Sequence, residues 1–141
     1  MNRLARKEAS PTEAVHFCTH CGALAHERAV RVCADCGLGV VLACAPGLLH
    51  RAGAAFLVVK SDLRISAASV GVEPLLGDVD ELVGQPLLDV LSGDPALPRW
   101  IVRAAMGSRR VVSVALRKGP RRVNAKVATC GSPTAALLVL E

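Results

Sequence analysis

The chain contains few aromatic side chains: its 141 residues include two Phe, one Trp and no Tyr. Hydrophobic residues nevertheless make up 52% of it, so Val, Leu and Ala must fill the core, and the composition excludes a globally disordered chain. The length suits one ordinary core of roughly 100 residues with a small appendage, and excludes two full domains.

Long apolar runs are also missing. The most apolar stretch, Leu38 to Leu49, ends at His50 and Arg51 and is well short of the roughly 20 residues of a membrane helix. The segment 1–8 begins basic but lacks the apolar run and the small-residue cleavage site of a secretory signal. We therefore expect no membrane span and a location in the reducing cytoplasm.

A reducing compartment disfavours a disulfide framework for the six cysteines and favours metal binding. Cys18 with Cys21, and Cys33 with Cys36, form two Cys-x-x-Cys-Gly motifs. Two residues between thiolates let both sulfurs reach one tetrahedral ion, and the following Gly tolerates a tight backbone. The motifs are separated by 11 residues, fewer than the roughly 15 to 20 usual for such a pair, but enough for a hairpin through 29–32.

These four cysteines predict one structural Zn²⁺ per chain in a small zinc ribbon. A catalytic dithiol, an iron site and unbound thiols remain as alternatives. A closed site of four thiolates leaves no position for water, so catalysis is not implied.

Other residues near the motifs have less specific interpretations. His16, His20 and His26 could each replace a thiolate, but four cysteines already satisfy zinc, so we expect solvent-facing histidines. Cys44 and Cys130 lack a flanking cation-rich helix start, so each is expected to be a buried, inert, small hydrophobic residue.

Composition divides the chain into three parts. Residues 1–15 are polar and interrupted by Pro11, which predicts a flexible tail or a short, poorly ordered helix. The cysteine segment covers 16–45 and is closed by Pro46-Gly47, and the main domain is expected at 54–141.

The main domain combines both kinds of regular structure. Pro74 and Pro86 suit the first turns of helices, Gly77 and Gly84 suit helix ends, and Asp94 is a candidate N-cap before Pro95. A longer helix is expected from Leu97, Ile101 and Ala104, which recur at helical spacing, and Gly107 ends it. Strands are predicted at 55–59, 63–67, 111–116, 122–129 and 135–140, the third and fourth joined by a turn at 118–121.

Three segments of this domain are similar to PAS domains, which are small sensor modules. They read Phe-Leu-Val-Val-Lys-Ser-Asp-Leu-Arg-Ile at 56–65, Leu-Leu-Gly at 75–77, and Glu-Leu-Val-Gly-Gln-Pro-Leu at 81–87. The resemblance implies an α+β fold, in which the zinc ribbon precedes a five-stranded antiparallel sheet with short helices on one side. The order of strands and helices read from the sequence agrees with it.

Departures from the family pattern bear on cofactors. The asparagine often found after the second strand is replaced by Ala68-Ser69-Val70, and the cysteine motif of flavin-binding members has no counterpart at 85–90. The chain has no histidine after His50, so the helix histidine of haem-binding members is missing. We expect no flavin and no haem. Any ligand would be small and apolar, between helices and sheet, and a packed core without ligand is the alternative that we favour.

The resemblance also implies a function in signalling. We expect no output region after Glu141 and therefore a single-module sensor or adaptor that acts through protein–protein binding, with the ribbon as a docking or dimer-stabilising attachment. Family members commonly dimerise through the outer sheet face and an N-terminal extension. Trp100 is assigned either to such a contact or to the core.

The charge distribution suggests an alternative. The formal net charge of +5 falls to about +3 once four thiolates bind Zn²⁺. Residues 62–94 carry seven acids against Arg64, whereas residues 95–141 carry nine bases against Glu141. A nucleic-acid-binding or transcription-associated regulator could use the ribbon and the basic hairpin 109–126, although that hairpin lacks interleaved aromatic residues and could simply be solvated.

We find no sequence signal for an enzyme. No nucleophile lies beside a base and no pair of carboxylates has a plausible catalytic spacing. Asp80 and Glu81 are interpreted as charges in the first turn of a helix. The chain is therefore expected to act by binding, and no catalytic residue is nominated.

Overall fold

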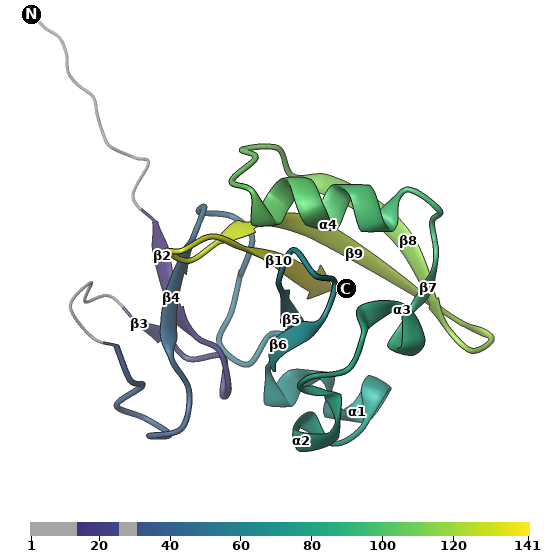
Figure 1. Ribbon diagram of the computed structural model, residues 1–141. Coiled ribbons are helices and arrows are strands. Elements are labelled where there is room, and N and C mark those ends of the chain that lie inside the picture. The colour runs from purple at the N-terminus through teal and green to yellow at the C-terminus, as the bar shows by residue number, and fades with distance from the viewer. Residues whose placement is uncertain (1–13, 26–30) are drawn as a thin grey trace, which may run out of the picture.

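The computed structural model describes residues 14–25 and 31–141, and it is dominated by a curled antiparallel sheet with a few short helices, as the resemblance implied (Figure 1). The predicted flexible tail lies outside the described residues except for Ala14 and Val15. In the described part, none of the helices is long and apolar enough to cross a membrane. The elements are β2 (Val15–Cys18), β3 (Leu24–Ala25), β4 (Val41–Cys44), β5 (Phe56–Val59), β6 (Ile65–Ala68), the 3₁₀ helix η2 (Val70–Val72), α1 (Glu73–Leu76), α2 (Val79–Leu82), α3 (Leu87–Val90), β7 (Ser92–Gly93), α4 (Leu97–Ala105), β8 (Val112–Lys118), β9 (Arg121–Cys130) and β10 (Ala135–Leu140).

The strands of the main domain follow the order β6-β5-β10-β9-β8, and all neighbouring pairs are antiparallel. The last strand of the chain therefore lies in the middle of this group. Within residues 14–25 and 31–141 the helices all come from the segment between β6 and β8, and α4 lies across the sheet (Figure 1).

The cysteine segment joins the same sheet. Strand β2 pairs antiparallel with both β3 and β4, and we call these three strands, with the described parts of their connecting loops, the cysteine module. Strand β9 pairs with β8 only as far as Val127, which leaves the end of β9 free to pair with β4. In the described part of the chain the sheet consequently contains nine strands, counting β7 and the cysteine module, where five were expected for the main domain alone.

Successive side chains along each strand point to opposite faces of the sheet, and each face carries its own hydrophobic cluster. In β5, Leu57 and Val59 belong to the cluster under the helices, whereas Phe56 and Val58 belong to the cluster on the opposite face. All six residues of β10 are buried because both of its faces are covered. The first cluster includes side chains of all four α-helices, including Leu76, Leu82, Leu87 and Ile101.

The second cluster attaches the cysteine module to the outer face of the sheet. The rings of Phe17 and Phe56 meet edge to face with centroids 5.1 Å apart and an interplanar angle of 85°. Leu48 and Leu49 add to this cluster against Leu137. Backbone hydrogen bonds strengthen the attachment: Val70 N–H donates to the carbonyl of His20 at 2.7 Å, and Gly53 N–H to that of Gly22 at 3.2 Å.

Helix boundaries agree with the sequence in part. Leu97, Ile101 and Ala104 form the buried face of α4, and Gly107 follows its end with φ of 97°. Two capping predictions were wrong. The N-cap of α4 is Ala96, because Pro98 rather than Pro95 occupies the first turn, and Asp94 instead accepts a hydrogen bond from Ala96 N–H. Pro86 is the N-cap of α3 instead of a first-turn residue.

Strand boundaries also differ slightly. Strand β6 begins at Ile65, two residues later than predicted, because Leu63 adopts φ of 66° and extends the turn after β5. The turn at 118–121 is a two-residue hairpin in which Lys118 lies opposite Arg121. Strand β10 occurs where the sequence predicted it.

Candidate metal centre

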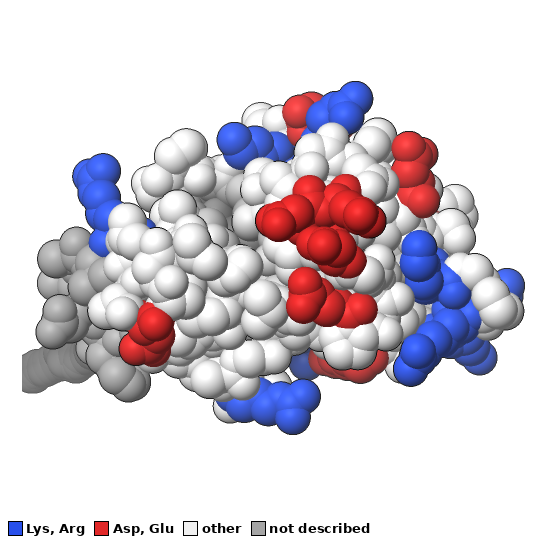
Figure 2. Space-filling model, turned by 90° about the horizontal axis from the view of Figure 1, so that it is seen from below, with Lys and Arg blue, Asp and Glu red and all other residues white. Residues whose placement is uncertain are grey.

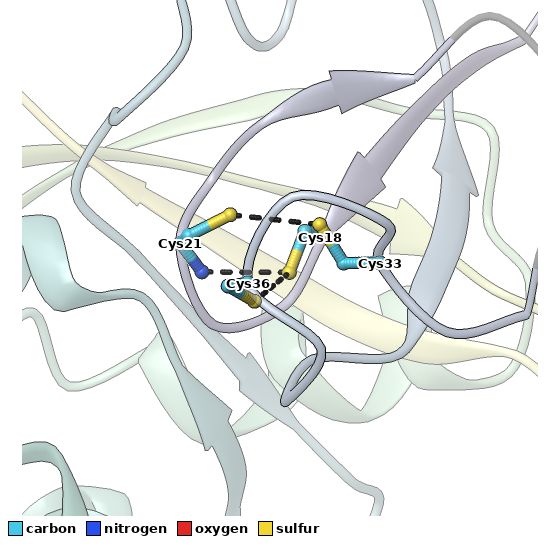
Figure 3. Close-up of side chains that lie close together, drawn as sticks. All are labelled: Cys18, Cys21, Cys33 and Cys36. Atoms are coloured by element: carbon cyan, nitrogen blue, oxygen red, sulfur yellow. Dashed lines mark hydrogen bonds between the residues drawn. The ribbon is translucent and has the colours of Figure 1, made fainter.

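Four cysteine side chains converge in the cysteine module (Figure 3). Cys18 ends β2 and Cys21 lies in the following turn, whereas Cys33 and Cys36 lie in the loop before β4. Their four Sγ atoms lie within 4.8 Å of one another. The two cysteine motifs, which are separated in sequence, therefore face each other and could hold one metal ion.

The sulfur spacing suits tetrahedral coordination. The Sγ atoms of Cys18 and Cys36 are 3.6 Å apart, and those of Cys21 and Cys33 are 3.7 Å apart. Four thiolates at the usual zinc–sulfur distance of about 2.3 Å would have sulfurs separated by about 3.8 Å. No large rearrangement is needed to place an ion between them.

Backbone amides are directed at the sulfurs. His20 N–H and Cys21 N–H point to Cys18 Sγ at 3.3 and 3.4 Å, and Leu38 N–H points to Cys36 Sγ at 3.4 Å. Gly22 and Gly37, which follow the motifs, adopt φ of 76° and 69°, a backbone conformation that other residues rarely adopt. Such N–H donors stabilise negative charge on thiolates and orient them for a metal.

The backbone of Gly39 passes very close to one of the four sulfurs. A Cβ atom at this position would overlap Cys18 Sγ and would lie 2.8 Å from the backbone nitrogen of His20. The backbone at Gly39 thus passes so close to a ligand sulfur that only glycine fits. This close approach was not predicted from the sequence, because Gly39 lies outside both cysteine motifs.

The metal-free thiols have divergent acidities. Hydrogen bonds from Leu38 and Gly39 N–H lower the pKa of Cys36 to about 6. Burial raises the pKa of Cys21 to about 12 and also raises that of Cys18. Without a cation, only part of the cluster can ionise at neutral pH, and a bound metal would displace the remaining protons.

The histidines do not join this cluster. Within the described ranges 14–25 and 31–141, the group that could hold a metal contains the four cysteines alone. His16 lies in β2 and His20 follows Cys18, both half-buried, whereas His26 lies outside the described residues. The prediction that cysteines alone supply the ligands is consistent with this arrangement.

Cys44 and Cys130 are buried free thiols, as predicted, but they are not independent of each other. They form the pair of opposite residues through which β4 joins β9. No local pattern in the sequence predicts this pairing, because 85 residues separate the two positions.

A groove of about 600 Å³ lies between the cysteine module, the sheet and α2. We call it the module groove. Its rim contains three exposed apolar side chains, Leu38, Val40 and Val83, with 74%, 53% and 45% of their surface accessible. Its other lining residues are Thr19, His20, Gly39, Leu42, Val58, Lys60, Ser66, Ala67, Ala68, Val79, Asp80, Ser132, Pro133 and Ala135.

Charges separate over the surface. Figure 2 shows carboxylates gathered at the centre of the face formed by α1 and α2, and positive groups at the end where Figure 1 places the β8–β9 hairpin. Asp80 and Glu81 occupy the first turn of α2, as predicted. In the hairpin, Arg117 lies opposite Arg122 and Lys118 opposite Arg121, so two successive pairs carry like charges.

Trp100 is surrounded by three further basic side chains. Its ring is half-buried against the helix-side core, and the guanidinium carbons of Arg99, Arg103 and Arg110 lie 5.9, 5.4 and 5.7 Å from its centroid. The sequence left open whether Trp100 belongs to the core or to a contact surface. It contributes to the edge of the core and also stacks with cations.

Comparisons with known proteins give one structural similarity. No family model matches the chain, and no curated protein matches it. The chain is similar to the crystal structure of the PAS domain of nitrogen regulation protein NR(II) from Vibrio parahaemolyticus, with 20% identity and a TM-score of 0.47. The similarity covers 61% of this chain and 84% of that one.

Proposed function

We propose that this protein is a PAS-type sensor or signalling adaptor that acts by binding another protein and not by catalysis. In this proposal the cysteine module is a zinc ribbon whose single Zn²⁺ is structural. The proposal of a protein partner rests on the module groove, which is lined by apolar side chains from the module, the sheet and α2.

Zinc is the ion that best suits the four sulfurs. The donor set consists only of thiolates, and the sulfur–sulfur distances of 3.6 and 3.7 Å agree with a tetrahedral site. The four ligands close the coordination shell, so the ion would stabilise the fold and leave no open position for a substrate. Native mass spectrometry of protein purified without added metal is expected to find one zinc ion per chain.

The exposed apolar rim of the groove favours a protein partner. Leu38 is 74% exposed although it lies between buried Gly39 and the half-buried ligand Cys36. Exposed apolar side chains that line one concave surface often mark an interaction site. By contrast, the outer face of β5 and β10 is already covered by the chain's own Phe17, Leu48 and Leu49. The proposed partner would therefore bind at the groove and not on that part of the outer face.

Replacing Leu38 with Asp is expected to weaken partner binding at least 30-fold. Losing the burial of one Leu side chain costs about 2 kcal/mol, which corresponds to that factor. Affinity enrichment from cells, followed by binding measurements on the enriched protein, gives the test.

Leu88→Asp is the matched control, because Leu88 in α3 is 45% exposed and does not line the groove. A partner that binds wild type and Leu88→Asp but not Leu38→Asp supports the proposal. If all three proteins retain the same partners with equal affinity, the groove is not the docking site. Sedimentation velocity of the same variants tests whether the partner is a second copy of the chain.

The basic hairpin supports nucleic-acid binding as a second candidate function. Like charges opposite each other destabilise a sheet, yet Arg117 and Arg122 form one such pair and Lys118 and Arg121 the next. A phosphate backbone would relieve this repulsion. Trp100, with its surrounding arginines, adds the aromatic surface that was missing from the hairpin sequence.

If the four paired residues Arg117, Lys118, Arg121 and Arg122 contact phosphates, affinity for a single-stranded or duplex oligonucleotide should fall about 50- to 150-fold between 50 and 200 mM salt. Arg122→Glu should weaken binding and reduce the salt slope, whereas Arg51→Glu, a charge reversal on an exposed residue outside the hairpin, should change it much less. Fluorescence anisotropy measures both. Binding that is absent or insensitive to salt would eliminate this candidate.

A further inference from the structure

The two cysteines outside the metal cluster lie at the junction between the cysteine module and the main sheet. Cys44 in β4 and Cys130 in β9 are directly opposite, and they are the residue pair that links these strands. Gly131 N–H donates to the carbonyl of Ala43 at 2.8 Å. This hydrogen bond connects the residues that flank the pair, so Cys44 and Cys130 occupy a non-hydrogen-bonded position of the ladder.

That position brings the two backbones close enough for a covalent bond. Opposite residues at non-hydrogen-bonded positions have Cα atoms about 4.5 Å apart, the shorter of the two spacings in an antiparallel pair. Disulfides usually join Cα atoms that are about 4.4 to 6.8 Å apart. The strand register therefore places the two thiols within bridging reach without a large backbone movement.

Cys44 and Cys130 border a common cavity from which a small reagent would approach them. Cys44 and Cys130 line the same apolar cavity of about 580 Å³, which also borders Arg109 and Val111 in the connection from α4 to β8. Their side chains are 4% and 2% exposed. Both are free thiols.

We propose that Cys44 and Cys130 form a modification site for low-molecular-weight disulfides, which convert the thiol pair into a cross-strand disulfide bond. The Cys44 thiolate attacks one sulfur of the reagent, and the other sulfur leaves as a thiolate. The Cys130 thiolate then attacks Cys44 Sγ and expels the second reagent thiolate. The protein loses two hydrogens, and the reagent is reduced to two thiols.

Burial of the two thiols lowers the rate of this exchange at neutral pH. Burial raises the pKa of Cys44 to about 11, and burial together with nearby Cys44 raises that of Cys130 to about 12. Only the thiolate attacks, so the exchange is slow at neutral pH and its rate rises about tenfold per pH unit between pH 7 and 10. Cys44, which is the more acidic and the more exposed of the two, reacts first.

The bond would couple the module to the sheet. It closes a loop from residue 44 to residue 130 and makes the β4–β9 junction covalent. Because Leu42, two residues before Cys44 in β4, lines the module groove, the bond would also restrict movement of one groove wall. An oxidised chain is expected to have a melting temperature roughly 5 to 10 °C higher than the reduced chain.

The test uses the full zinc-loaded chain and glutathione disulfide at several pH values between 7 and 10. Mass spectrometry should find a loss of two hydrogens with zinc retained, and cleavage after Lys126 releases a peptide, 127–141, that contains Cys130 and no other cysteine. That peptide should be linked to the segment with Cys44. Cys130→Ala should instead accumulate a mixed disulfide at Cys44.

Peptide mapping of the wild-type chain decides the outcome even if the variant does not fold. A bond between Cys44 and Cys130 that forms faster at higher pH supports the proposal. The proposal is overturned if both cysteines remain free while disulfides form among Cys18, Cys21, Cys33 and Cys36 with loss of zinc. It is also overturned if oxidation stops at a mixed disulfide in the wild-type chain.

Discussion

Replacement of Gly39 by Ala is expected to reduce zinc affinity more than 100-fold. The added methyl group would overlap Cys18 Sγ, and the backbone nitrogen of His20 blocks its displacement to the side. Since changes that only disturb the surroundings of metal ligands cost about 10- to 100-fold in affinity, a direct clash with a ligand sulfur should cost more. Competition with a chromogenic zinc chelator measures the affinity, and native mass spectrometry the metal content.

Gly47→Ala is the matched control. It introduces the same methyl group at a glycine that has open space around it, although its φ of 90° makes the substitution strained. This variant should retain its zinc, whereas Cys33→Ala should lose it because a ligand is missing. If Gly39→Ala binds one zinc ion with wild-type affinity, Cys18 Sγ cannot occupy the position described here.

Phe17→Ala is expected to destabilise the chain by about 3 to 5 kcal/mol, a large fraction of the usual stability of a domain. Phe17 is fully buried and packs edge to face on Phe56, so truncation opens a cavity between the cysteine module and the sheet. For a chain of this size the melting temperature should fall by roughly 10 °C or more. Thermal unfolding followed by circular dichroism measures the change.

Zinc content distinguishes lost packing from a lost metal site. Phe17→Ala leaves all four ligands in place, so one zinc ion per chain should remain below the unfolding transition. Val102→Ala, at a side chain that is 37% exposed on α4, should change the unfolding free energy by less than about 0.5 kcal/mol. A shift of less than 2 °C for Phe17→Ala would mean that the module is not anchored through this ring.

Local signals in the sequence predicted the elements well. Strand β9 and the buried face of α4 follow from apolar periodicity, because each periodicity reflects one type of backbone geometry. Prediction of the N-cap of α4 failed because two prolines, Pro95 and Pro98, both suit a first turn, and local preference does not choose between them. The late start of β6 depends on the positive φ of Leu63, which its residue type disfavours.

The sequence by itself determined the candidate metal ligands, since the spacing within each cysteine motif is a local constraint on which sulfurs can share an ion. It also determined the charge separation between the two halves of the main domain. Only the tertiary structure decided what surrounds these features: the approach of Gly39 to Cys18, the module groove, and the pairing of Cys44 with Cys130. Each of these features brings together residues that are distant in the sequence, within the cysteine module or where the module packs on the sheet. That docking results from packing between apolar faces distant in the chain, and no local pattern encodes which faces meet.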